Sequence, residues 1–187
     1  MEAVAEALAK LSSAQSNALN LFRSSGIKSI LKSGYNTHLT DVIECTQSTA
    51  IKGGHNKVKF FDYLRNNNIQ INEIARNKSA INGVEEIIYK IPSKDAAGNI
   101  LKDASGNIIW KNQEFRKTIF DPAIISEAEM ISIGEQAMKE GLDSVRLTFQ
   151  NGSNTIIDAV APNGLKFKGY WNSITGEIDN FHPVLEW

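Results

Sequence analysis

Near residue 69 the hydrophobic pattern of this 187-residue chain changes its period, and this change restricts the possible folds strongly. Before that point apolar residues recur at helical spacing, over 4–22 and again over 58–64. After it, short runs rich in Ile, Val, Phe and Tyr alternate with turn residues, which is typical of antiparallel strands. The sequence therefore predicts the α+β class, with helices mostly early and strands mostly late.

Local signals place several elements. Short helical pieces are expected at 27–32 and 39–47, and the helix over 58–64 should stop at the asparagines 66–68. Ser126 and Glu129 form a capping box for a helix that runs to Lys139, because both side chains can bond free amides at its start. Strands are expected at 69–75, 84–91, 108–110, 115–120, 145–149, 155–160, 165–171 and 177–181.

A short internal echo separates two of these strands. The phrase Asp95-Ala-Ala-Gly-Asn-Ile returns as Asp103-Ala-Ser-Gly-Asn-Ile, and an Asp-x-x-Gly-Asn segment between apolar residues is typical of a hairpin turn. We expect a protruding β-excursion here rather than a repeated domain. The length fits a single domain over 1–187, with a helical lobe over 1–80 and a mostly β lobe over 81–187.

Composition excludes several classes of protein. No apolar run approaches the 18 residues of a membrane span, and the first residues lack the features of a signal peptide. Cys45 is the only cysteine, so an internal disulfide and a cysteine-based zinc site are excluded. The motifs of P-loop, dinucleotide-binding and Gly-x-Ser-x-Gly enzymes are absent from the sequence.

The net charge of −1 hides an uneven distribution along the chain. Residues 46–117 hold 12 basic and 7 acidic residues, whereas residues 118–187 hold 4 basic and 10 acidic residues. The basic middle could meet a polyanion and the acidic end a protein partner, although composition alone favours solvated loops and strands of random sign.

The most informative segment is Ile51-Lys-Gly-Gly-His55-Asn. Two glycines before a helix start predict a turn with uncovered backbone amides, which suits a phosphate, and Lys52, Lys57 and Lys59 add positive charge. His38 lies 17 residues upstream, near enough for its loop to return to the same cleft. Three alternatives stay open: both histidines are turn residues without a joint role, Cys45 is a nucleophile beside one of them, or His38, His55 and His182 bind a metal.

Two imidazoles and a lysine around one phosphate suffice to cleave RNA, because the substrate's own 2′-hydroxyl attacks. The order of His38, Gly53-Gly54-His55, a lysine at the start of a strand, and Ile178-Asp-Asn-Phe-His-Pro183 resembles the EndoU endoribonuclease superfamily. The phrases Lys-Gly-Gly-His-Asn and Lys-Thr-Ile-Phe-Asp-Pro are most similar to bacterial EndoU toxin domains, found at the C-termini of contact-dependent growth inhibition and similar polymorphic toxins. The resemblance implies N-terminal helices and two antiparallel sheets that flank a catalytic cleft.

The resemblance also implies the roles of individual residues. His55 matches the general base that removes the 2′-proton, and His38 matches the general acid that protonates the leaving 5′-oxygen. Lys117, at the start of its strand, matches the catalytic lysine, with Lys90 as the alternative. The expected products are a 2′,3′-cyclic phosphate and a 5′-hydroxyl, formed without a metal or cofactor.

Further positions are expected to bind the substrate. Gly54 and Lys52 belong to the phosphate turn. Asp121 and Asn180 stand where uridylate-specific members carry a serine and a threonine, and His182 replaces a usual tyrosine. Uridine specificity is therefore not expected, and His182 can stack on a base or ribose or can simply cap the strand end.

For a toxin of this kind, the resemblance implies a chain secreted as the C-terminal part of a larger protein. It would act in the cytoplasm of the target bacterium on RNA, with transfer RNA as the usual target, and a cognate immunity protein would block its cleft. No membrane partner is expected. Two other functions stay open, a non-catalytic module that binds RNA or protein and a metal-dependent hydrolase that uses the three histidines.

Overall fold

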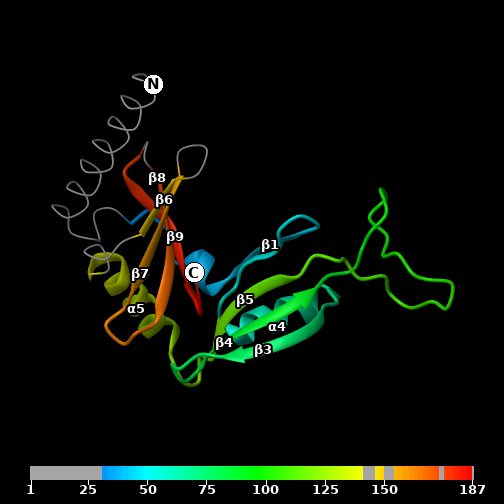
Figure 1. Ribbon diagram of the computed structural model, residues 1–187, viewed down its shortest axis with the longest axis horizontal. Coiled ribbons are helices and arrows are strands. Elements are labelled where there is room, and N and C mark those ends of the chain that lie inside the picture. The colour runs from blue at the N-terminus through cyan, green and yellow to red at the C-terminus, as the bar shows by residue number, and fades with distance from the viewer. Residues whose placement is uncertain (1–30, 141–145, 150–153, 173–174, 187) are drawn as a thin grey trace, which may run out of the picture.

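The computed structural model describes residues 31–140, 146–149, 154–172 and 175–186 (Figure 1). Within these ranges the chain forms three helices and three antiparallel sheets, which confirms the α+β class. The sheets have two, three and four strands, where the sequence predicted two antiparallel sheets. In the described ranges, no helix has both the length and the apolar character that a membrane crossing requires.

The first large sheet has the order β3-β4-β5 and carries helix α4 on one face. Its strands are β3 (Asn72–Lys78), β4 (Val84–Lys90) and β5 (Phe115–Phe120), and α4 spans Lys57–Asn66. Phe60 and Leu64 lie four residues apart, so both point from α4 toward the sheet. They pack there against a core that includes Ile87, Tyr89 and Ile119.

The second large sheet has the order β6-β7-β8-β9 and packs against helix α5 (Glu127–Glu140). Its strands are β6 (Arg146–Phe149), β7 (Asn154–Val160), β8 (Lys166–Asn172) and β9 (Glu177–Val184). The helix lies close to the strands because two glycines line the contact. A Cβ at Gly134 would lie 2.2 Å from the Phe181 ring, and one at Gly169 would lie 2.5 Å from the Met138 sulfur.

The third sheet occupies the segment expected to be a helix over 39–47, and that expectation is wrong. Only Thr37–Thr40 is helical, as α3, and the chain then forms the hairpin of β1 (Val42–Thr46) and β2 (Ala50–Gly53). Ala50 and Ile51 of β2 are buried in the core beneath α4, and Val42 and Cys45 of β1 pack against the same core. This tertiary burial favours an extended strand, which the local sequence does not show.

Several local predictions are confirmed. Strand β5 has the expected bounds, and the Glu129 amide donates to the Ser126 hydroxyl at 3.2 Å at the start of α5. In both Asp-x-x-Gly-Asn turns the aspartate carboxylate accepts from the amide of the asparagine, and the excursion extends away from the sheets (Figure 1).

Other sequence predictions differ from the structure or are not tested by it. The strand expected at 69–75 begins at Asn72, and 108–110 forms only isolated bridges. The helix over 4–22 and most of the piece at 27–32 lie outside the described residues, although Leu31 pairs in parallel with Ile178. The division at residue 80 stays a prediction; β3 and β4 pair across it.

Candidate active site

A cavity of about 690 Å³ lies where α3, β2, β5, β8 and β9 meet. All three histidines of the chain line it. His38 comes from α3, His55 follows β2, and His182 comes from β9, so tertiary structure rather than a local motif brings them together. We call this cavity the histidine pocket.

The loop that carries His55 is tied to α3. The Gly54 amide donates to the His38 carbonyl at 3.1 Å, and the His55 amide donates to the Leu39 carbonyl at 2.9 Å. Gly53 and Gly54 both have a φ of +70°, and a Cβ at Gly53 would lie 2.5 Å from the Asp41 carbonyl oxygen. Glycine is therefore required here for both its backbone conformation and its close approach to the neighbouring chain.

These bonds correct the expectation of uncovered amides at the double glycine. The amides of Gly54 and His55 are already paired with backbone carbonyls, and Gly54 does not line the histidine pocket. At the start of α4 the Asn56 side chain accepts from the amides of Val58 and Lys59. The turn thus positions His55 instead of offering its own amides to an anion.

The backbone around His55 fixes its protonation pattern. Its side chain is only 4% exposed, and Nδ1 lies 2.6 Å from the Thr118 carbonyl oxygen. A carbonyl oxygen can only accept, so Nδ1 carries the hydrogen of this bond. In the neutral ring Nε2 is therefore the free base.

The three imidazoles are close neighbours. The His55 and His182 rings are stacked with centroids 4.8 Å apart, and His38 lies 5.5 Å from His55 and 5.6 Å from His182. The ring nitrogens that could bind a metal all lie within 4.8 Å of one another. Buried Nδ1 atoms of His38 and His182 have no hydrogen-bond partner among the described residues.

Lys117 is a buried basic residue that lines this pocket. Its side chain is 6% exposed, and Nζ donates to the Gly53 carbonyl at 2.7 Å. Burial lowers the pKa of Lys117 to about 7. Lys90, the alternative, pairs with Asn72 across the sheet and does not line the pocket.

The same burial keeps the histidines neutral. Desolvation, then the charge of Lys117, then that of Lys52, lowers the pKa of His38 to about 4. Burial is also the main cause that holds the pKa of His55 and of His182 well below the usual value, with Lys117 adding to it in both cases. At neutral pH the free protein therefore presents three uncharged imidazoles.

Other predicted substrate residues divide into two groups. Lys52, Asn180 and His182 line the histidine pocket. In β9, Asn180 and His182 lie on one face because strand residues alternate, and the intervening Phe181 is buried against α5.

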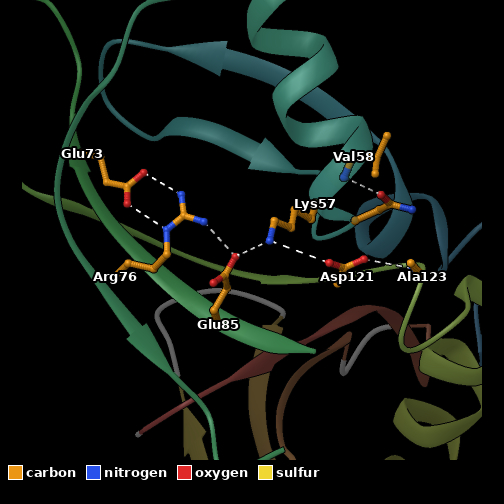
Figure 2. Close-up of polar contacts among 8 residues, drawn as sticks. Lys57, Val58, Glu73, Arg76, Glu85, Asp121 and Ala123 are labelled. Atoms are coloured by element: carbon orange, nitrogen blue, oxygen red, sulfur yellow. Dashed lines mark hydrogen bonds and ion pairs between the residues drawn. The ribbon is translucent and has the colours of Figure 1, made fainter. Parts of the chain in front are cut away.

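Asp121 lies outside the pocket. It follows β5, 3.8 Å from Lys57 at the start of α4, and Figure 2 shows how these side chains continue into a chain of ion pairs. Glu85 accepts from Lys57 and from Arg76, both at 2.9 Å, and Arg76 also pairs with Glu73. We call these five residues the ion network.

Other pocket residues were not among the predicted site residues; for Tyr170 the sequence allowed a stacking role but favoured packing in the core. Tyr170 lines the pocket and stacks on His182 with ring centroids 5.8 Å apart, and Arg116 lies at its edge. The alternation of β8, which faces Tyr170 toward Asn180 in the paired strand, is the signal that could have found Tyr170. Cys45 does not line the pocket, and burial raises the pKa of its thiol, which argues against a nucleophile.

Comparison with known proteins adds two relatives. Over 146 residues the chain is 30% identical to "tRNA nuclease CdiA" of Yersinia mollaretii and 33% identical to "tRNA nuclease CdiA" of Escherichia coli strain STEC_O31. Each match covers 78% of this chain and 4% of the relative, so the chain spans only a small part of these long proteins. No protein-family model matches the chain.

Proposed function

We propose that this chain is the endoribonuclease toxin region of a CdiA-like protein and that it cleaves transfer RNA. The observation that carries the proposal is the convergence of His38, His55 and the buried Lys117 on one pocket. The printed names of the two relatives support the choice of tRNA as substrate. The EndoU-type mechanism is part of this proposal and is supported by the order of these residues in the chain.

The tautomer of His55 suits it to the role of general base. Because Nδ1 donates to the Thr118 carbonyl, Nε2 is free to take the proton of the attacking 2′-hydroxyl. The 2′-oxygen then bonds to phosphorus while the bond from phosphorus to the 5′-oxygen breaks. This gives the 2′,3′-cyclic phosphate.

His38 supplies the second proton transfer. The leaving 5′-oxygen takes a proton from the protonated imidazole of His38 and departs as a hydroxyl. Burial lowers the pKa of His38 in the free protein, and a bound phosphate favours the charged form, so substrate binding and protonation of His38 are coupled.

Lys117 stabilises the charge that develops on the phosphoryl oxygens. Its position in a buried site strengthens this interaction relative to water. The anion also favours the charged ammonium, although burial lowers the pKa of Lys117 to about 7 in the free protein. Lys52 and Asn180, which line the same pocket, would contact the flanking backbone or base.

The proposal also covers how the chain would be delivered and inhibited. The chain would be delivered as the C-terminal part of a larger secreted protein, act in the cytoplasm of a target bacterium, and be neutralised by an immunity protein that covers the histidine pocket. Co-expression with the immunity protein should restore growth of cells that express the chain, and a complex of the two should lose cleavage.

The direct test is incubation of the purified protein with total tRNA in EDTA, followed by mapping of the new ends. We expect 2′,3′-cyclic phosphate and 5′-hydroxyl ends that disappear in His38→Ala and His55→Ala. Arg76→Ala, in the ion network, is the matched control and should cleave like the parent protein. The alternative of a metal-dependent hydrolase, which the proximity of the three histidines favours, predicts no cleavage in EDTA.

A further inference from the structure

The three imidazoles also meet the requirements of a transition-metal site. They offer ring nitrogens within 4.8 Å of one another from three separate elements of the fold. We propose that His38, His55 and His182 together bind one divalent ion of the zinc class, and that the bound ion excludes the RNA phosphate from the histidine pocket. The exclusion rests on the proposed function, whereas the binding does not.

The rings must turn toward one another to close around an ion, because their nitrogens lie up to 4.8 Å apart. Zinc binds imidazole nitrogen at about 2.0–2.1 Å in tetrahedral geometry, which places neighbouring nitrogens roughly 3.3 Å apart. The described residues give the Nδ1 atoms of His38 and His182 no hydrogen-bond partner, so turning these rings breaks no hydrogen bond at that atom. His182 must leave its stacked position on His55 to do so.

His55 supplies the fixed ligand. Histidines that bind metal commonly donate the second ring N–H to a carbonyl or carboxylate, which sets the tautomer and the ring orientation. The bond from His55 Nδ1 to the Thr118 carbonyl has this arrangement and leaves Nε2 as the ligand atom. In the proposed site, Nε2 of His55 is therefore held in place, and the ligand nitrogens of His38 and His182 adjust to it.

The donor set selects the class of ion. Three imidazoles suit Zn²⁺, Cu²⁺ or Ni²⁺, whereas Mg²⁺ and Ca²⁺ prefer oxygen ligands. Asp179 is the acidic residue that lines the pocket, and its carboxylate pairs with Lys32 at 3.2 Å. Water would complete a tetrahedral set, as in other zinc sites with three protein ligands.

A bound ion and catalysis exclude each other. The ion takes the lone pair of His55 that would accept the 2′-proton, and it also takes the lone pair of His38. Lys117 lines the same pocket, so its positive charge opposes the ion and limits the affinity. Replacing Lys117 by an uncharged residue should therefore tighten metal binding while it weakens catalysis.

The test uses the untagged full chain, treated with EDTA and then desalted. Titration with Co²⁺, followed by visible absorption, and with Zn²⁺, followed by calorimetry, should give one ion per chain. His38→Gln and His182→Gln should each weaken binding at least tenfold, and Lys117→Met should strengthen it several-fold. Lys90→Met is the matched control and should bind like the parent protein, and Mg²⁺ should not bind.

A measurement on the parent protein guards against variants that fail to fold. The chain has three histidines, all in this cluster, so each imidazole NMR signal reports on the site. One equivalent of Zn²⁺ should shift the signals of all three. Absence of binding, or shifts confined to one imidazole, would overturn the proposed site.

Cleavage assays separate this proposal from the proposed function. Cleavage of tRNA by the metal-free, desalted protein that falls on addition of Zn²⁺ supports both, and cleavage that Zn²⁺ does not affect overturns the exclusion alone. Zinc binding by all three imidazoles without any cleavage supports the site and contradicts the nuclease. Cleavage that requires zinc overturns the exclusion and the metal-independent mechanism together.

Discussion

The histidine pocket and the ion network are both polar clusters beside the sheet of β3, β4 and β5, yet they differ in whether their charged groups have partners of opposite charge. In the ion network, Lys57, Arg76 and their carboxylate partners balance one another in partly exposed pairs (Figure 2). In the pocket, a buried lysine and three imidazoles meet without a carboxylate bonded to any of them in the described structure.

This difference separates a structural cluster from a functional one. Paired surface charges contribute little to stability, and each already has a partner of opposite charge. A buried cation and buried ring nitrogens without partners cost folding free energy, so the pocket is suited to an additional group that interacts with them. Substitutions in the two clusters should therefore have opposite patterns of effect on activity and stability.

The largest expected effect is on catalysis by the histidines. His55→Ala removes the base and His38→Ala removes the acid, so each should lower kcat/KM on tRNA by about 10³-fold. His38→Ala should not weaken the fold greatly, because its buried Nδ1 has no hydrogen-bond partner in the described structure, whereas His55→Ala also loses the bond to the Thr118 carbonyl and should cost about 1–3 kcal/mol of stability. Single-turnover cleavage and thermal unfolding measure the two effects. Cleavage within tenfold of the parent protein in either variant would contradict the assigned role.

Lys117→Met should lower kcat by about 10²-fold, because it removes the charge that stabilises the transition state. The same change should raise stability at neutral pH, since methionine fills the buried site without desolvating an ammonium. Lys90→Met is the matched control, with unchanged kcat. If Lys90→Met loses activity and Lys117→Met keeps it, the catalytic lysine has been assigned wrongly.

The third prediction concerns pH and stability. The pKa of His38 is about 4 in the folded protein and 6.5 when unfolded, so the unfolded chain binds more protons between these values. The free energy of unfolding should therefore fall as pH drops from 6.5 to 4, with His38 contributing on the order of 2 kcal/mol. Urea unfolding at several pH values checks this. A slope in His38→Gln as steep as that of the parent protein would contradict it.

The smallest effect belongs to the ion network. Glu85→Gln weakens the pairs with Lys57 and Arg76, and should cost no more than about 1 kcal/mol of stability at low salt and less at high salt. Cleavage of tRNA should stay within twofold of the parent rate. A large loss of activity would show that the network, too, belongs to the active site.

Local sequence chemistry predicted much of the fold. The Ser126 cap, the two Asp-x-x-Gly-Asn turns and the strand over 115–120 depend on residues close together in the chain, and all are present. The hairpin of β1 and β2 was missed because burial in a core shared with α4, β4 and β5, rather than local propensity, decides its conformation.

The candidate site was predicted in part for the same reason. From the residue types and their order in the chain we predicted His38, His55 and Lys117 as site residues, and all three line the pocket. The partners of the backbone amides, and the pairing of Asp121 with Lys57, depend on α3 and β5 meeting the double-glycine loop. Contacts between segments that lie apart in the chain cannot be predicted from the spacing of residues in the sequence.

The comparison of the two clusters is tested most directly by NMR titration of the three imidazoles, free and bound to a fully 2′-O-methylated tRNA that cannot be cleaved. The free protein should show pKa values below 6.5 for all three, with His38 near 4, and the bound RNA should raise the pKa of His38 by at least one unit. Ordinary pKa values in the free protein, or a His38 signal that does not respond to RNA, would contradict a buried pocket that binds a phosphate.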